Sequence, residues 1–154
     1  MKDKPLPELR TDEGAQSRLK EIADEVSGWP GVSTCAHRFG GLEFRVGKRE
    51  VGHLHDFGIV DIPFTVPIRD AIIRAGWAER HHVLPDSGWT TVRINKHGKD
   101  TALMLLRLSY LRIGLKADDP SVADQAWREL ERIGLEPEVL EVLRESLRAA
   151  RWAV

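Results

Sequence analysis

The segment from Leu42 to His55, which reads LEFRVGKREVGHLH, constrains the fold of this chain more than any other. Two short runs of alternating apolar and polar residues flank Gly47 and Lys48, and such alternation is typical of half-buried β-strands. Glycine at the first central position favours a type II′ turn, because that position needs a positive φ. The segment is therefore predicted to be an antiparallel β-hairpin with a two-residue loop.

The two-residue loop also predicts which residues face each other. It places Phe44 opposite Val51 and Leu42 opposite His53. His55 follows His53 by two residues, so both histidines are predicted on the apolar face of the hairpin. The other face is expected to carry the charged side chains Glu43, Arg45 and Glu50. A one-residue change of register would exchange the two faces, so the placement of the histidines depends on this pairing.

The rest of the chain predicts further strands and several helices. Strands are expected at 32–38, 59–62, 77–84 and 89–94, the last two as a second hairpin. Helices are expected from residue 11 or 12 to 27, and over 65–75, 99–113, 120–133 and 137–151. The helix at 99–113 is apolar on nearly every side, so we expect it to cross the sheet and cover the face of Phe44. The predicted fold is α+β: an antiparallel β-sheet built from hairpins with helices packed on one face, plus a C-terminal αα-hairpin.

The character of the chain changes at Gly114, and this predicts three parts. Residues 1–10 are a flexible N-terminal lead, 11–114 an α+β core, and 115–154 a C-terminal helical hairpin. Two amphipathic helices make up the last part, and their apolar faces can pack on the core or on a second copy of the chain. A homodimer through 120–151 is therefore one option.

Composition excludes several classes of protein. The formal net charge of the 154 residues is −1, which argues against a strongly basic nucleic-acid-binding domain. The single cysteine, Cys35, excludes an intrachain disulfide and a four-cysteine zinc site, and its alternating surroundings predict a buried, inert thiol. No apolar run approaches the roughly 20 residues of a membrane span, and the polar N-terminus is not typical of a signal peptide. A cytoplasmic protein is predicted.

Histidines are the main concentration of reactive side chains. His53 and His55 share one face of a strand, whereas on a strand only one of His81 and His82 can face the same site. The candidate site is the place where these side chains could meet aromatic and charged neighbours, namely Arg38, Glu43, His53, His55, His81, His82 and Trp89.

Three interpretations of this site are open. His53 and His55 are candidate metal ligands, with Asp61 or Glu43 to add a carboxylate. Histidines can instead shuttle protons as general acids and bases. The third interpretation is that they are hydrogen-bonded side chains at the rim of a core, and on this basis no metal is predicted.

The region from Trp29 to Tyr110 resembles a family of small bacterial proteins that carry the label "luciferase domain". The motifs that carry the resemblance are Trp29–Val32, His37–Gly41, Glu43–Phe44, Gly52–His55, Asp61–Phe64, His81–Trp89 and Leu106–Tyr110. The family label implies no light emission, because the flavin-dependent luciferase fold is a (β/α)₈ barrel and this chain is too short for one. The region from His81 to Tyr110 is also similar to MmcQ/YjbR-like proteins, a compact α+β group suspected of DNA binding.

The leading functional prediction is a luciferase-domain-like protein that is a non-catalytic binding module for a small ligand or a protein partner. One alternative is an enzyme that uses histidine acid–base or metal chemistry at a His53/His55 site. Another is a nucleic-acid-binding domain of MmcQ/YjbR-like type, which the net charge disfavours. No cofactor and no membrane partner are predicted, and the sequence defines no catalytic residue.

Overall fold

The computed structural model describes residues 13–37 and 41–152, so the predicted N-terminal lead and Arg38 lie outside the described residues. The helices are α1 (Glu13–Ser27), α2 (Val66–Arg74), α3 (Ile94–His97), α4 (Lys99–Leu115), α5 (Pro120–Leu130) and α6 (Pro137–Trp152). The strands are β1 (Val32–Ala36), β2 (Leu42–Val46), β3 (Arg49–His55), β4 (Ile59–Ile62), β5 (Glu79–Arg80) and β6 (Thr90–Arg93).

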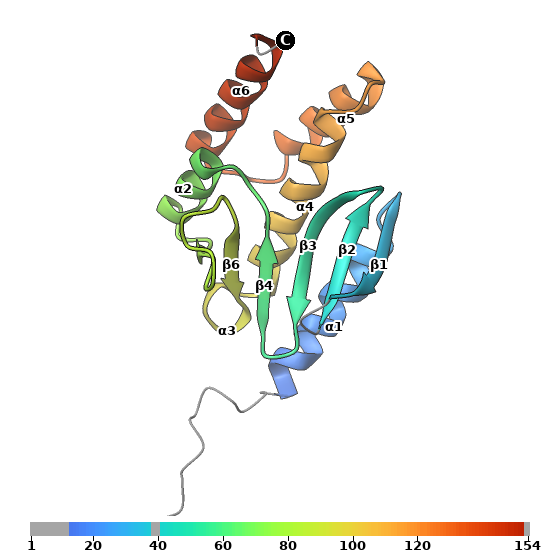
Figure 1. Cartoon of the computed structure of the whole chain (residues 1–154), viewed down its shortest axis with the longest axis vertical. Coiled ribbons are helices and arrows are strands. Elements are labelled where there is room, and N and C mark those ends of the chain that lie inside the picture. Colours follow the sequence, from blue (N-terminus) through green and yellow to red (C-terminus); the bar gives the residue numbers. More distant parts are fainter. Residues whose placement is uncertain (1–12, 38–40, 153–154) are drawn as a thin grey trace, which may run out of the picture.

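The strands form one antiparallel sheet in the order β1-β2-β3-β4-β6-β5. Helices α1 and α4 lie against one face of this sheet, while the two C-terminal helices stand beyond one end of it (Figure 1). This arrangement confirms the predicted α+β fold with its hairpins and its C-terminal helical pair. In the part of the chain that the structure describes, no helix combines the length and the apolar composition needed to cross a membrane.

Helix α4 provides the centre of the core, as its apolar composition predicts. Its buried Leu105 and Leu106 belong to the same cluster as Phe44 and Val51 of the sheet. Ser109 on the same helix donates a hydrogen bond of 2.7 Å to the carbonyl oxygen of Val51. A side chain so buried needs such a partner, because an unpaired hydroxyl in a core is costly.

The C-terminal helices pack on the main body of the chain. Helix α5 lies against α4, and α6 lies against α2. Leu130, Val139 and Leu143 are buried in the cluster that also contains Phe44. The apolar faces considered for a homodimer are thus largely used inside the chain, and a homodimer through 120–151 stays a prediction.

The hairpin begins as predicted and then departs from the predicted register. Gly47 has a φ of 60°, no described non-glycine residue has a positive φ, and Arg45 pairs with Glu50, as a type II′ turn requires. Beyond Arg45 the register shifts at a β-bulge, so that Phe44 pairs with Gly52. One extra residue in β3 therefore lies between the turn and the histidines.

The bulge reverses the predicted position of the histidines. Leu42 pairs with Leu54, and His53 pairs with Glu43. The prediction that His53 and His55 lie on the apolar face was therefore wrong, because a one-residue shift moves every following side chain to the opposite face. Both histidines lie on the face of the sheet away from α4, together with Glu43.

The second hairpin is shorter than predicted. Strand β5 pairs with β6 but covers only Glu79–Arg80, and residues 81–89 form a loop in place of the rest of the predicted strand. Outside a strand, neighbouring side chains need not point in opposite directions. His81 and His82 can therefore both point toward the same site, which a strand would have prevented.

Candidate metal centre

Three adjacent strands bring the polar side chains of the site together. His53 on β3 pairs with Asp61 on β4, and Asp61 pairs with Thr91 on β6. Directly paired residues point to the same face, so these three side chains form a row across the middle of the sheet. His55 lies on the same face because it follows His53 by two residues.

Asp61 is the centre of the site. Its side chain has no exposed surface, and its Oδ2 atom lies 2.8 Å from His55 Nε2, 3.2 Å from His53 Nε2 and 3.3 Å from His81 Nε2. Its other oxygen, Oδ1, accepts a hydrogen bond of 2.7 Å from the Thr91 hydroxyl. Three imidazole nitrogens thus converge on one carboxylate oxygen.

The surroundings keep the Asp61 carboxylate ionised. Burial by itself would raise the pKa of Asp61, but the hydrogen bonds from His53, His55 and Thr91 outweigh it and hold the pKa below its usual range. A buried charge of this kind is tolerated only with several partners, so the histidines and Asp61 depend on one another.

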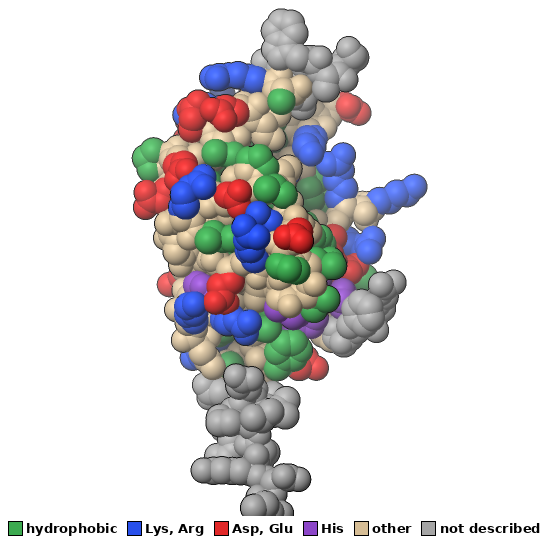
Figure 2. Space-filling view, turned by 60° about the vertical axis from the view of Figure 1, so that its left-hand side comes forward, with side chains coloured by type: hydrophobic (Ala, Val, Ile, Leu, Met, Phe, Trp, Pro, Cys, Tyr) green, Lys and Arg blue, Asp and Glu red, His purple; other side chains and the backbone are tan. Residues whose placement is uncertain are grey.

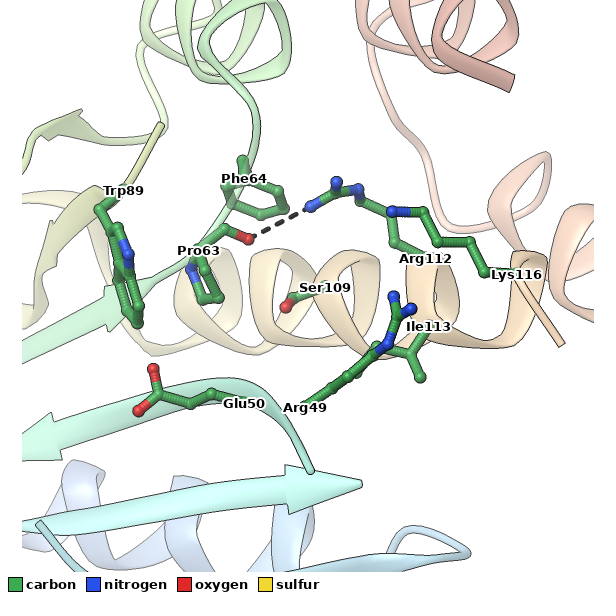
Figure 3. A pocket seen from close by; sticks show the side chains of 9 residues that line it. All are labelled: Arg49, Glu50, Pro63, Phe64, Trp89, Ser109, Arg112, Ile113 and Lys116. Atoms are coloured by element: carbon green, nitrogen blue, oxygen red, sulfur yellow. Dashed lines mark hydrogen bonds between the residues drawn. The ribbon is translucent and has the colours of Figure 1, made fainter. Parts of the chain in front are cut away.

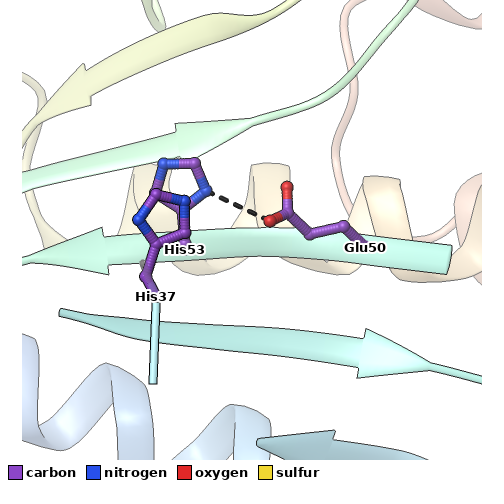
Figure 4. A group of neighbouring side chains, drawn as sticks. All are labelled: His37, Glu50 and His53. Atoms are coloured by element: carbon purple, nitrogen blue, oxygen red, sulfur yellow. Dashed lines mark hydrogen bonds and ion pairs between the residues drawn. The ribbon is translucent and has the colours of Figure 1, made fainter. Parts of the chain in front are cut away.

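His53 lies between two carboxyl groups. Its Nδ1 atom is 3.3 Å from Glu50 Oε1, and the ring of His37 stacks on it with 3.9 Å between centroids (Figure 4). Burial alone would lower the pKa of His53, but the hydrogen bonds to Asp61 and Glu50 outweigh it and raise the pKa to about 9. Glu50 therefore fixes the orientation of the ring and leaves Nε2 directed at Asp61.

His81 has a different role, which its hydrogen bonds define. Its Nδ1 atom accepts from the backbone N–H groups of Val83 at 3.1 Å and Leu84 at 3.0 Å. A neutral imidazole that accepts at Nδ1 carries its proton on Nε2, so Nε2 donates to Asp61. Burial lowers the pKa of His81, in keeping with this neutral form. In this arrangement His81 is a neutral hydrogen-bond donor to Asp61.

A buried arginine holds the loop that carries His81. The guanidinium group of Arg69 on α2 donates to the carbonyl oxygens of Pro85 at 3.1 Å and Ser87 at 2.6 Å, and it forms an ion pair with Asp70. Sequence reasoning did not identify Arg69. The only available signal was a charged residue next to Ile68 on the predicted apolar face of that helix.

A cavity of about 810 Å³ opens over these groups. Histidine side chains reach the surface among hydrophobic side chains on this flank of the molecule (Figure 2). Besides the histidines and Asp61, the cavity is lined by Cys35, Ala36, Glu43, Arg45, Glu50, Val83, Leu84 and Trp89. Its volume is within the range of small-molecule sites, which is about 300–1,000 Å³.

The rim of the cavity carries two neighbouring acidic side chains, Glu43 and Glu50. Glu43 is buried, and its hydrogen bonds with Glu50 and then with Arg45 lower its pKa to about 2, whereas burial raises the pKa of Glu50. Cys35 lies 3.3 Å from Glu43 and is exposed, so the prediction of a buried thiol was wrong. The strand there is at the edge of the sheet, where alternation does not ensure burial.

The structure brings six of the predicted site residues to this cavity, namely Glu43, His53, His55, His81, His82 and Trp89. Their role in binding stays a prediction. The sequence also indicated Asp61 as one of two acidic partners, and the structure places it at the centre. Glu50, Thr91 and Arg69 were missed, because their contacts arise from the bulge, from the pairing of β4 with β6 and from the 81–89 loop.

Comparison with family models gives a match to part of the chain. A family model described as "Luciferase domain" matches residues 48–109, about two fifths of the chain. The matched region begins at the turn of the first hairpin, ends within α4 and contains His53, His55, Asp61 and His81. No curated protein and no solved structure matches the chain. The resemblance to the luciferase-domain family is thus confirmed over residues 48–109, the part of the chain that holds most of the histidine site.

Proposed function

We propose that the chain binds a divalent transition-metal ion through His53, His55 and Asp61 and uses it on a small molecule in the adjoining cavity. The observation that carries the proposal is the convergence of two imidazole Nε2 atoms on one buried carboxylate oxygen, at 2.8 and 3.2 Å. Ligands about 2.1 Å from a metal ion lie roughly 3.0 Å apart when they are at right angles. Both distances from Asp61 therefore match the spacing of neighbouring ligands, and the three donor atoms all lie within 4.8 Å of one another.

The two imidazole groups and the carboxylate limit which metal ions the site would bind. Two histidines and one carboxylate form the ligand set of many iron(II) oxygenases, and imidazole also suits zinc, copper and nickel. Such an ion supplies either an activated water or a binding position for an oxygen-containing ligand. Three protein ligands leave coordination positions open, and the cavity lies next to them.

The neighbours of the three ligands support the same proposal. Glu50 accepts from the Nδ1 of His53, and a carboxylate behind a histidine is a common support for metal ligation. Thr91 occupies Oδ1 of Asp61 and leaves Oδ2 for the ion. His81 donates to the same carboxylate and holds a proton beside the cavity, where it can meet a bound ligand.

The test is metal content. The purified full chain is stripped with a chelator, incubated with iron(II), zinc or nickel at neutral pH, desalted and analysed. One metal ion per chain is expected for the wild type. Asp61→Asn and His55→Ala are each expected to reduce the metal content by tenfold or more. Asp56→Asn and His97→Ala, which change an exposed aspartate and a histidine outside the cavity, are the matched controls. A wild-type content no higher than that of Asp61→Asn would contradict the proposal.

A second candidate function is the non-catalytic binding of a small ligand. The observation in its favour is the apolar part of the cavity lining, which includes Val83, Leu84 and Trp89. Binding of small aromatic molecules to the stripped protein, with no change when metal is added, would favour this function over the first.

A further inference from the structure

A second pocket, of about 330 Å³, lies between the start of β3 and helix α4. It is lined by Arg49, Glu50, Pro63, Phe64, Trp89, Ser109, Arg112, Ile113 and Lys116 (Figure 3). We propose that Arg49, Arg112 and Lys116 make this pocket a binding site for the phosphate group of a small phosphorylated molecule.

The pocket exists because β3 and β4 separate. β4 pairs only with His53–His55, so residues 49–52 of β3 have no partner from that strand. β4 ends at Ile62, and the chain turns away at Pro63, which has no N–H group to continue the pairing. Helix α4 closes the bottom of the gap with Ser109 and Arg112 (Figure 3).

Among the described residues, the three cations have no acidic partner. In the described part of the chain, no carboxylate lies within 4 Å of the charged groups of Arg49, Arg112 or Lys116, although Arg45, Arg74, Arg93 and Arg107 are all paired. Within the described ranges, the side chain of Arg112 donates only to the carbonyl oxygen of Pro63, at 3.3 Å, and its guanidinium lies over the ring of Phe64. The positive charge of the pocket is therefore uncompensated.

Electrostatic repulsion among Arg49, Arg112 and Lys116 also indicates that the positive charge of the pocket is uncompensated. Burial and then the charge of Arg49 lower the pKa of Arg112, and burial followed by the charges of Arg112 and Arg49 lowers the pKa of Lys116. A bound dianion would relieve the repulsion among all three cations.

The chemistry of the donors favours phosphate. Two guanidinium groups and one ammonium group offer more N–H donors than a single carboxylate can accept, and phosphate has the charge and the acceptor oxygens to use them. The pocket shares Glu50 and Trp89 with the histidine cavity, so a molecule anchored here extends toward His53. That extension rests on the proposed metal function, whereas binding of the phosphate group does not.

The experiment is a calorimetric titration of chelator-treated full chain with inorganic phosphate at constant ionic strength. Metal is absent from this measurement, so failure of the metal proposal leaves its outcome unchanged. Saturable binding of one phosphate per chain is expected. Lys116→Gln and Arg49→Gln, which change exposed residues, are each expected to weaken phosphate binding by about tenfold or more. Lys20→Gln, which removes an equal charge from the surface of α1, should leave the affinity for phosphate unchanged.

Three outcomes would overturn the proposal. They are the absence of saturable phosphate binding, equal binding by wild type and both variants, and an affinity for acetate as high as that for phosphate. The last result would mean that the pocket is a binding site for a carboxylate group and not for phosphate. Arg112→Gln is a less decisive variant, because it also removes the hydrogen bond to Pro63.

Discussion

At the scale of single residues, the site depends on Asp61 and its hydrogen-bond donors. A carboxylate without exposed surface would be destabilising in a sheet of apolar side chains, and here Thr91 and three histidines compensate for it. Each of these contacts therefore contributes to the stability of the fold as well as to the geometry of the site. The closeness of the histidine nitrogens to Oδ2 of Asp61 is a consequence of the same charge balance.

Thr91→Val tests this balance. Loss of a hydrogen bond to a buried, ionised carboxylate should lower the free energy of unfolding by about 1.5–3 kcal/mol. Thr90→Val is the matched control, since Thr90 is equally buried but donates to the neutral carbonyl oxygen of Ile62 at 3.0 Å. Thr90→Val should lower the free energy of unfolding by about 0.5–1.5 kcal/mol. Urea denaturation measures both, and equal costs would show that the charge of Asp61 is not what Thr91 stabilises.

At the scale of elements, the bulge in β3 decides which face the histidines occupy. Gly52 lies at the bulge, and a Cβ atom there would come within 2.8 Å of Leu106 Cδ2 and 2.9 Å of the Asp61 carbonyl oxygen. Only glycine allows β3 to lie this close to both β4 and α4. A glycine within a predicted strand was therefore the one sequence signal of the bulge.

Gly52→Ala should destabilise the chain by about 1–3 kcal/mol, because the backbone of β4 cannot move aside without displacing Asp61. The metal affinity of the proposed site should fall in the same variant. Gly28→Ala is the control, since its nearest contacts would be 3.4 and 3.8 Å and its backbone conformation suits any residue. Chemical denaturation and metal titration measure the two effects. An unchanged stability of Gly52→Ala would mean that the close packing of the three elements is not required.

At the scale of the whole molecule, the C-terminal helices and the sheet share one core. Leu143 on α6 and Phe44 on β2 belong to the same buried cluster, and Arg107 on α4 forms an ion pair with Glu129 on α5. The predicted division at residue 114 separates elements that are packed together. We therefore expect 11–114 and 115–154 to unfold as one unit.

Leu143→Ala should lower the stability of the whole chain by about 2–4 kcal/mol, because it leaves a cavity in the shared core. The unfolding transition should stay single, with coincident curves from circular dichroism and from the NMR signals of the sheet. Val122→Ala, at a position with 40% exposure, should change stability by roughly 0.5 kcal/mol or less. A separate, earlier transition of the helices alone would show instead that they form an independent domain.

The sequence by itself determined the local elements and the fold class. The Gly47-Lys48 turn, the apolar helix α4 and the pair α5–α6 each follow from periodicity and from turn residues, which act over a few positions. The sequence also indicated that the histidines and Trp89 would meet. Only the tertiary structure decided how they meet, because the bulge depends on contacts of Gly52 with α4 and β4, and the approach of His81 and His82 to Asp61 depends on a loop held by Arg69. The pocket lined by Arg49, Arg112 and Lys116 likewise arises where β3 and β4 separate. Such features come from contacts between residues far apart in the chain, which no local pattern encodes.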